Sequence, residues 1–291
     1  MRFARPNGFI QAGNLLTPVI LVYLGWSIYN MNLALIAITN EGINVAQRIK
    51  EKLDGEVTVF LPQKIKQTKL AATYYSKKFG DQIGDLFSHY EGLIFIMASG
   101  IVVRTITPYI TDKYNDPAVV VVDDVGRFVI SLLSGHEGGA NNLTHKVANI
   151  LHTDAVITTG TEAQKDIIIG IGCKRGIGSH EVKEAINSAL EKAEVSIGRV
   201  RLAGTVDLKA DEVGLLGALD ELGIPLRVVS RPEIDTCAKD YSKSDFVIEK
   251  IGVGGVSEPA ALISGRKTKL ILKKQKYPGI TIAIAQENFS W

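Results

Sequence analysis

The stretch LALIAITNEGINVAQRIKEKLDGEVTVFLP (33–62) decides the fold class, because its hydrophobic pattern changes period twice. LALIAIT (33–39) is a nearly continuous apolar run of strand length, and VTVFLP (57–62) is a second one. Between them, GINVAQRIKEKL (42–53) has the spacing of an amphipathic helix. Short apolar strands separated by helices are typical of a parallel sheet covered on both faces. The stretch therefore predicts an α/β fold.

The same alternation continues to residue 163. It predicts a helix over 70–90, strands at 93–99 and within 118–133, a helix over 141–151 and a strand at 155–161. Within 118–133, Asp124-Val125-Gly126 indicates a hairpin turn between two strands. We expect residues 31–163 to form an N-terminal domain with an open, mostly parallel sheet and helices on both faces.

A second, smaller α/β domain is predicted for residues 164–291, with the boundary near Ala163–Asp166. Its expected elements are a strand entering a glycine-rich turn at 165–176, helices over 179–193 and 211–225, a glycine loop that leads into a helix at 251–262, and a hairpin over 269–285. Ser179 and Ser257 are the expected N-caps of two of these helices. Tyr277-Pro278-Gly279 suits the turn of the hairpin.

Length and composition set the broad class. With 291 residues, 46% of them hydrophobic, the chain is long enough for two domains and can bury a substantial core. Lys plus Arg total 33 against 31 for Asp plus Glu, so the chain lacks the strong basic excess of a nucleic-acid-binding protein. Cys173 and Cys237 are far apart, which supports neither a disulfide framework nor a structural zinc site. We expect a cytoplasmic protein with no nucleic-acid partner.

Residues 1–30 differ from the rest of the chain. Arg2 and Arg5 precede the apolar run LLTPVILVYLGW (15–26), which is short for a membrane span and is not followed by a small-x-small cleavage site. We interpret this segment as an extension upstream of a domain whose first strand begins near Met31. Membrane attachment is the alternative.

The loop SGHEGGANN (134–142) joins one ionisable pair, His136 and Glu137, to three glycines between a predicted strand and a predicted helix. Glycines let the main chain approach a ligand closely, and free N–H groups at a helix N-terminus favour a negative group. Histidine can act as an acid or a base near neutrality, and Glu137 could orient it or a water. The alternative is a tight connection whose histidine faces solvent. The zinc motif H-E-x-x-H is absent, because Ala140 stands at the second histidine's position and His145 lies too far along.

ASGIVVRTITP (98–108) repeats this arrangement of a strand end, a small polar turn and a helix start. It carries Arg104, which could hold a carboxylate through two hydrogen bonds. The alternative for Arg104 is a surface ion pair with Asp112 or Asp116.

GIGCKRGIG (170–178) resembles a dinucleotide-binding loop at first sight. Its glycines are spaced G-x-G-x-x-x-G, one residue too long, and Glu191 and Glu194 stand in a helical stretch where a strand-end acid is needed. A loop that binds an anion with Lys174 and Arg175 fits better. Further glycine-rich or lysine-rich turns occur at 209–214, 251–262 and 273–279. Together these turns predict a small polyanionic ligand, and the chain has neither a G-x-S-x-G elbow nor a P-loop.

Several of these motifs occur in the order of one known family. The run 100–151, followed by AVITTGT (155–161), resembles the signature of the cobalt-precorrin-5A hydrolase family, the G proteins of anaerobic cobalamin biosynthesis. Four further stretches of this chain resemble the C-terminal domain of that family: IGIGCKRG (169–176), TVDLKADEVGLL (205–216), IGVGGVSEPAAL (251–262) and KQKYPGITIAIA (274–285). The resemblance covers Met31 to Ala285. Longer members insert a middle region where this chain passes within a few residues from Thr161 to Ile167, and we interpret that region as dispensable.

The resemblance implies a hydrolase that opens the δ-lactone of a cobalt-bearing macrocycle and releases the extruded two-carbon unit as acetaldehyde. The substrate carries acetate and propionate arms, in agreement with the anion-binding turns. The protein itself is expected to need no cofactor, because the cobalt arrives inside the substrate. The expected partner is this polycarboxylate cobalt-corrinoid, and neighbouring pathway enzymes and a second copy in a homodimer are further candidates.

We expect the macrocycle to lie between the two domains, at the carboxyl ends of strands. His136 is the predicted general base and Glu137 its partner, and Asp124 is a further catalytic candidate unless its Asp-Val-Gly only forms the turn. The residues expected to bind the substrate lie in the turns or at neighbouring element ends: Ser99, Gly100, Arg104, Gly135, Gly138, Gly139, Asn141, Thr159, Thr161, Arg175, Gly176, Lys209, Glu212, Gly254, Ser257, Glu258, Lys276 and Tyr277.

Two functions of other classes stay open at this point. The chain could be a carrier that binds a corrinoid without reacting with it, which an acetaldehyde assay would separate from a hydrolase. It could also be a nucleotide-binding regulatory or dehydrogenase module, for which tight binding of NAD or ATP would be the indication.

Overall fold

A computed structural model of the chain describes residues 31–65, 68–76, 78–237 and 255–289. The segment interpreted as an extension, residues 1–30, lies outside these described residues, and so does Gly254. None of the helices within the described ranges is long and apolar enough to cross a membrane.

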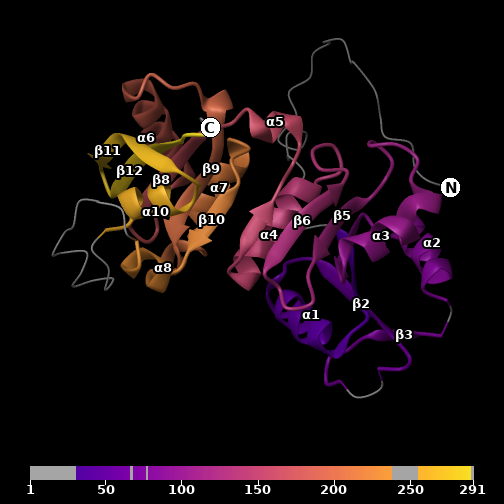
Figure 1. The fold of residues 1–291 in the computed structure, drawn as a ribbon. Helices are drawn as coiled ribbons and strands as arrows, with labels where there is room; N and C mark the ends of the chain where they lie inside the picture. The colour runs from indigo at the N-terminus through magenta and orange to yellow at the C-terminus, as the bar shows by residue number, and fades with distance from the viewer. Residues whose placement is uncertain (1–30, 66–67, 77, 238–254, 290–291) are drawn as a thin grey trace, which may run out of the picture.

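The first half of the chain alternates strands and helices, as the hydrophobic pattern predicted (Figure 1). Its elements are β1 (Asn32–Ala37), α1 (Asn40–Lys52), β2 (Glu56–Pro62), β3 (Thr73–Tyr75), α2 (Phe79–His89), β4 (Gly92–Ile96), α3 (Ser99–Ile106), η2 (Thr107–Tyr109), β5 (Ala118–Val122), β6 (Phe128–Leu133), α4 (Ala140–Leu151), β7 (Asp154–Val156) and α5 (Gly160–Ala163). The start of α1 is fixed by Thr39, whose hydroxyl accepts a hydrogen bond from the Gly42 amide at 3.0 Å.

Within the described residues these strands form one sheet in the order β3-β2-β1-β4-β5-β6-β7. The first five strands in this order are parallel, β6 is antiparallel to β5, and β7 is parallel to β6. The reversal is the predicted hairpin, in which the Gly126 amide donates to the Asp123 carbonyl at 2.8 Å. The carboxyl ends of β1, β4 and β5 therefore lie on one edge of the sheet, and those of β6 and β7 lie on the opposite edge.

Helices cover both faces of this sheet. Leu33 and Leu35 of β1 point to one face and pack in a cluster with α1 and α4. Ala34 and Ile36, the alternate residues, point to the other face and pack with α2 and α3. The structure thus confirms an open, mostly parallel sheet with helices on both sides.

The second half contains its own sheet and core. Its elements are β8 (Ile167–Cys173), α6 (Ser179–Lys192), η3 (Ile197–Arg199), β9 (Val200–Val206), η4 (Asp207–Lys209), α7 (Val213–Glu221), β10 (Leu226–Val229), α8 (Arg231–Asp235), α10 (Ser257–Ile263), β11 (Thr268–Tyr277) and β12 (Ile280–Glu287). In the described part of the chain the strand order is β10-β9-β8-β12-β11. β8, β9 and β10 are parallel, and the predicted hairpin adds β12 and β11 in antiparallel directions.

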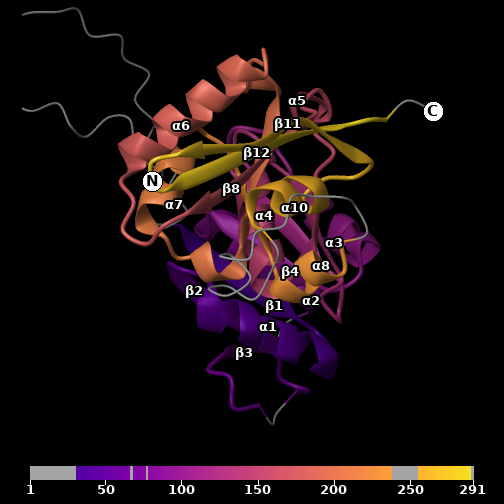
Figure 2. The same ribbon diagram turned by 90° about the vertical axis from the view of Figure 1, so that its left-hand side faces the viewer.

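The second sheet is also covered on both faces, as Figure 2 shows with α10 and α6 on opposite sides of it. Alternate isoleucines of β8 point to opposite faces of the sheet: Ile169 packs with α6 and α7, and Ile168 packs with α10. α10 lies very close to β8, because a Cβ placed on Gly170 would be 1.7 Å from the Ser257 carbonyl oxygen.

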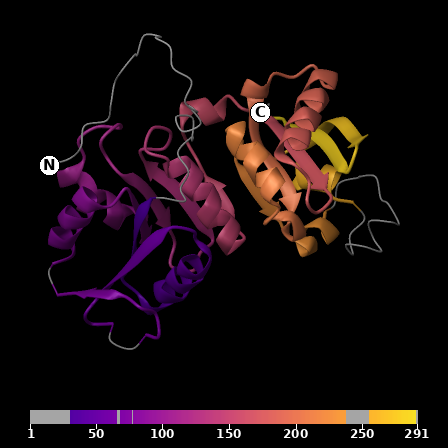
Figure 3. The same ribbon diagram turned by 180° about the vertical axis from the view of Figure 1, so that it is seen from behind.

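The two halves meet where α4 lies beside β10, the edge strand of the second sheet (Figures 1 and 3). The Asn149 side chain of α4 joins this edge. Its Nδ2 donates to the Leu226 carbonyl at 2.8 Å, and its Oδ1 accepts from the Val228 amide at 2.9 Å. One amide group thus satisfies two backbone groups of an otherwise open strand edge.

The structure differs from the predicted elements in four places. Residues 70–90 are not one helix, because Thr73–Tyr75 pair with β2 as an edge strand and α2 begins only at Phe79. The strand predicted at 155–161 ends at Val156, and α5 follows. The N-caps are Gly178 and Val256 instead of Ser179 and Ser257, which are each the first helical residue. β9 and β10 are not among the predicted elements.

Candidate functional site

The loop 134–139 connects β6 to α4 and holds the predicted histidine. The amides of Gly138 and Ala140 both donate to the Ser134 carbonyl, at 3.1 and 3.2 Å, so the chain folds tightly back on itself. Ser134 is buried and has φ 55°, in the left-handed region that non-glycine residues rarely adopt. A Cβ on Gly138 would lie 2.4 Å from that of Ser134, so only glycine fits there. We call residues 134–139 the histidine loop.

The two ionisable residues of the histidine loop have different surroundings. His136 is exposed to solvent. Glu137 accepts a hydrogen bond from Lys113 Nζ at 2.7 Å, and this bond lowers the pKa of Glu137 below its usual range and raises that of Lys113. Glu137 is therefore a carboxylate at neutral pH and cannot donate a proton. In the described part of the chain it makes no hydrogen bond to His136.

Asn141, at the start of α4, connects the preceding strand β6 to the N-cap of α5. Its Oδ1 accepts from the Ser131 hydroxyl at 2.8 Å, and its Nδ2 donates to Thr159 Oγ1 at 3.3 Å. Gly135 lies against the same group, since a Cβ there would be 2.7 Å from Asn141 Oδ1. The structure thus brings together six of the predicted binding residues, all at the carboxyl ends of β6 and β7: Gly135, Gly138, Gly139, Asn141, Thr159 and Thr161.

Asp124 lies at the opposite edge of the first sheet from His136, so the expectation that the two act on one substrate group is wrong. The reason is the hairpin, which reverses the chain between β5 and β6. Asp124 Oδ1 instead accepts a hydrogen bond from the Thr39 hydroxyl at 2.6 Å, and Thr39 caps α1. The role that the structure gives Asp124 is to support a helix start.

The edge of the sheet that holds Asp124 also holds Ser99, Gly100 and Arg104, because α3 follows the carboxyl end of β4. The Arg104 side chain runs back towards the helix start, where its Nη2 would be 3.5 Å from a Cβ on Gly100. The ion pair that was the alternative for Arg104 does not form with Asp116, which is buried and accepts hydrogen bonds from the amide and hydroxyl of Thr111. These residues are separated from the histidine loop by the length of the strands.

The predicted anion loop of the second sheet is filled by carboxylates of the chain itself. Arg175 pairs with Asp211 at 2.6 Å, and the Gly176 amide donates to Glu212 Oε1 at 3.0 Å. Glu212, predicted to contact substrate, is only 5% exposed. Lys209 lies beside them at the end of η4. The groups expected to bind a substrate carboxylate thus already have one.

The remaining predicted residues of the second sheet are structural in this fold. Ser257 and Glu258 are buried beneath the sheet, and Glu258 Oε1 accepts from the Lys274 amide at 2.8 Å. The Tyr277 ring lies 5.0 Å from Lys192 Nζ, and Lys276 is exposed on β11 next to it. Both residues are distant from the histidine loop, because β11 is the edge strand of the second sheet on the side opposite β10, which contacts the first half.

Two pockets lie between the halves, one on each side of the contact between α4 and β10, and His145 of α4 lines both. His136 lines neither of them, so the expectation that it faces these interdomain spaces is not met. None of the other predicted site residues that the structure describes lines them either. The larger pocket, of about 780 Å³, lies against α1 and α7. The smaller, of about 450 Å³, is rich in charged groups, and we call it the arginine pocket.

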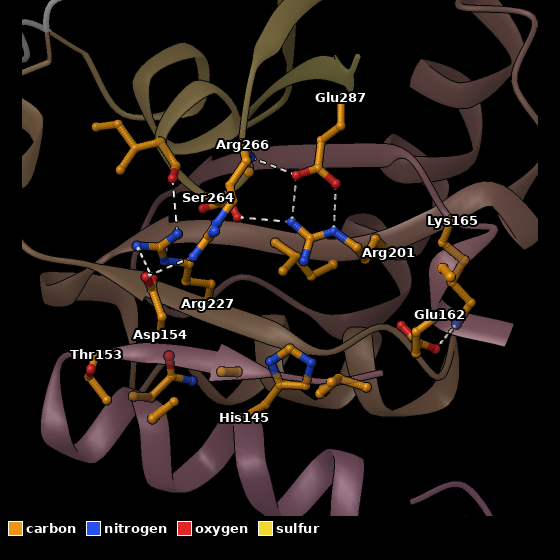
Figure 4. Close-up of a pocket in the computed structure, with 18 of the residues that line it drawn as sticks. His145, Thr153, Asp154, Glu162, Lys165, Arg201, Arg227, Ser264, Arg266 and Glu287 are labelled. Carbon is orange, nitrogen blue, oxygen red and sulfur yellow. Dashed lines mark hydrogen bonds and ion pairs between the residues drawn. The ribbon is translucent and has the colours of Figure 1, made fainter. Parts of the chain in front are cut away.

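The arginine pocket is lined by cations and carboxylates from both halves (Figure 4). Its charged residues are Lys165, Arg201, Arg227, Arg266, Asp154, Glu162 and Glu287. The imidazole of His145 rises from α4 towards Arg201 and Arg227. Burial, and then the charges of Arg201, Lys165 and Arg227, lower the pKa of His145 from 6.5 to about 4. His145 is therefore a neutral group at physiological pH.

Sequence reasoning missed His145 as a site residue. It considered this histidine only as a zinc ligand, and it gave the helix one apolar face, formed by Leu143, Val147, Ile150 and Leu151. α4 also faces the other half of the molecule, where its His145 and Asn149 line both pockets. The sequence of the helix carries no signal of this second face, because the residues that pack on it come from distant parts of the chain.

Comparison with known proteins gives two family matches in sequence order. The family model described as cobalamin synthesis G N-terminal matches residues 81–162, and the one described as cobalamin synthesis G C-terminus matches residues 167–285. The first match ends in α5 and the second begins at β8. Between them stand only residues 163–166.

Named relatives agree with these matches. A cobalt-precorrin-5A hydrolase of Priestia megaterium is 27% identical over 352 aligned positions, which cover 87% of this chain and 94% of the relative. One of Salmonella typhimurium is 41% identical over 134 residues, or 46% of this chain and 37% of the relative. The crystal structure of a cobalamin biosynthesis protein G homologue from Sulfolobus solfataricus is 22% identical, covers 90% of this chain and 99% of that one, and has a TM-score of 0.35. The 352 aligned positions exceed the 291 residues of this chain, so the Priestia megaterium protein has segments with no counterpart here.

Proposed function

Because the chain belongs to the cobalamin synthesis G family, we propose that it is a cobalt-precorrin-5A hydrolase. The observation that carries the proposal is the order of the two family matches, one on each half of the fold, with almost nothing between them. Two relatives that bear this enzyme name support it, one of them aligned over 87% of this chain. In this proposal the middle region of longer members is dispensable for the reaction; the alternative is a reduced member with altered function.

The reaction proposed is the opening of the substrate's δ-lactone and the release of acetaldehyde. Water attacks the lactone carbonyl carbon, the acyl C–O bond breaks, and the products are a carboxylate and a hydroxyl on the extruded carbon. When this hydroxyl loses its proton, the bond from that carbon to the ring breaks. The electron pair stays with the conjugated macrocycle, and acetaldehyde leaves. One water is consumed for each acetaldehyde, and the cobalt belongs to the substrate throughout.

His136 is the residue proposed to accept the proton of the attacking water. Its position supports this role in two ways. It is exposed, so that a large macrocycle can reach it, and it stands on a loop held rigidly by Ser134, Gly138 and Asn141. Glu137, kept anionic by Lys113, would stabilise the positive charge that develops on the imidazole. Asp124 has no part in this step, because it lies on the other edge of the sheet.

The test is acetaldehyde release from cobalt-precorrin-5A under anaerobic conditions, with binding followed by the absorbance of the corrinoid. We expect the His136→Ala variant to lose acetaldehyde release by at least a hundredfold while it binds the substrate about as tightly as the wild type. His180→Ala is the matched control, because His180 is also an exposed histidine and lies near Glu184 on α6. Its turnover should equal that of the wild type.

Two outcomes would overturn parts of this proposal. Full turnover by His136→Ala would remove His136 from the mechanism. Binding of the corrinoid by the wild type without any acetaldehyde would identify a carrier instead of a hydrolase.

A further inference from the structure

The arginine pocket lies outside the histidine loop, and the proposed mechanism leaves its charged groups unused. Its volume of about 450 Å³ is within the range of small-molecule sites. Its walls come from both domains: β7, α4 and α5 of the first, and β9, β10 and the end of α10 of the second. A ligand here would be held by both halves of the molecule.

Two of its four cations are fully paired. Lys165 Nζ donates to Glu162 Oε1 at 2.6 Å, and Arg201 Nη2 donates to Glu287 Oε1 at 3.0 Å. Both are charge-assisted hydrogen bonds. Such pairs have little charge left to attract a further anion.

The other two cations share one carboxylate at long range. Nη2 of Arg227 and Nη2 of Arg266 each lie 3.6 Å from an oxygen of Asp154, beyond hydrogen-bond distance. Arg227 also donates hydrogen bonds to the Ile263 carbonyl at 3.0 Å and to Glu233 Oε1 at 3.4 Å, and Glu233 lies outside the pocket lining and also accepts hydrogen bonds from Ser230. The lining residues alone have four cations against three carboxylates, and Arg227 and Arg266 are the two cations whose carboxylate in the lining lies beyond hydrogen-bond distance.

His145 supplies a second and independent indication of a ligand. It is 8% exposed, and neither ring nitrogen forms a hydrogen bond with any other residue that the structure describes. Buried polar groups normally have a partner, and this imidazole points into the pocket (Figure 4). A neutral imidazole offers one N–H donor and one acceptor nitrogen.

We propose that the arginine pocket binds a carboxylate group, which Arg227 and Arg266 hold as ion-pair partners and to which His145 donates a hydrogen bond. The added carboxylate balances the one positive charge by which the cations of the pocket lining exceed its carboxylates, and it gives His145 the partner that it lacks. The identity of the ligand rests on the proposed function: it is an acetate or propionate arm of the corrinoid. The existence of a carboxylate site does not rest on the proposed function, because the arginines and the imidazole line the pocket whichever molecule carries the carboxylate.

The first experiment needs no corrinoid. Protein labelled at its histidines is titrated with tricarballylate, a small tricarboxylate, and the ring resonances of His145 are followed by NMR. We expect a saturable shift in the wild type, and at least a tenfold weaker midpoint in Arg227→Gln. Arg127→Gln is the matched control, because Arg127 also pairs with an aspartate, Asp123, and does not line the pocket. No shift in the wild type, or an equal midpoint in Arg227→Gln, would overturn the proposal.

The second experiment assigns the ligand. With cobalt-precorrin-5A as substrate, Arg227→Gln should raise KM by at least tenfold and leave kcat within about twofold, because the arm is held equally before and during the reaction. If the wild type binds tricarballylate but releases no acetaldehyde, the proposed function fails and the carboxylate site stands. If turnover is normal and Arg227→Gln has an unchanged KM, the arm does not bind in this pocket.

Discussion

At the residue scale, the two histidines of the α4 region show what a sequence can and cannot reveal. His136 could be identified because glycines surround it, and glycine clusters are visible in any sequence. His145 could not, because its importance comes from what packs over it: Arg201, Lys165 and Arg227 all belong to segments beyond α4 and reach it only after the second domain docks. Sequence patterns report the local helix face and not a distant partner.

The low pKa of His145 makes stability depend on pH. In the unfolded chain its pKa is near the ordinary 6.5, and burial lowers it to about 4 in the fold. Between these values the unfolded chain binds the proton and the folded chain does not, so the free energy of unfolding falls as the pH falls through this window. Below about pH 4 both states are protonated, and the loss stops growing. Of the stability lost between pH 7 and pH 5, about 2 kcal/mol should come from His145.

Denaturant unfolding of His145→Gln at pH 7 and pH 5 checks this prediction. The variant should lose about 2 kcal/mol less than the wild type over this range, because glutamine does not titrate. His180→Gln removes an exposed histidine and should keep the wild-type difference. An unchanged difference in His145→Gln would contradict the buried, neutral imidazole.

At the element scale, the close contact between α10 and β8 makes a sharp prediction. A Cβ on Gly170 would lie 1.7 Å from the Ser257 carbonyl oxygen and 2.6 Å from the Ala261 amide nitrogen. Both are backbone atoms, so α10 itself would have to move. Gly170→Ala should therefore lower the free energy of unfolding by about 3 kcal/mol in denaturant unfolding. Gly160→Ala, where nothing lies within 4 Å of a new Cβ, should leave it nearly unchanged.

The same helix explains why β9 was not predicted. Its central residues, Ala203 and Gly204, are small because α10 lies over them, and a Cβ on Gly204 would be 2.7 Å from the Ala260 carbonyl oxygen. Small residues interrupt the run of β-branched side chains that marks a strand. β1 and β5 have no such constraint along their length, and their apolar runs predicted them correctly. β8 has the same close contact at Gly170, but three consecutive isoleucines precede that glycine and were enough to predict the strand. Strands were thus predictable where a run of branched apolar side chains remained.

At the scale of the whole molecule, strand direction decided which predicted site residues meet. The sequence predicted that Asp124, Arg104 and His136 all lie at element ends, and this is correct. The hairpin predicted within 118–133 already implies that His136 and Asp124 lie at opposite edges, whereas the parallel pairing of β5 with β4, which places Arg104 on the same edge as Asp124, is seen only in the fold. The second domain completes the arginine pocket beside α4. His145, the residue of α4 that points into this pocket, lies five residues after Ala140, which is about 7.5 Å along the helix axis.

The most direct measurement is the amount of acetaldehyde that the purified chain alone releases from cobalt-precorrin-5A in a single turnover. The account predicts one equivalent of acetaldehyde for each corrinoid bound, with no added protein, because both halves that match the family models are present and the proposed reaction uses no middle region. A bound corrinoid with its lactone intact and no acetaldehyde would contradict the account.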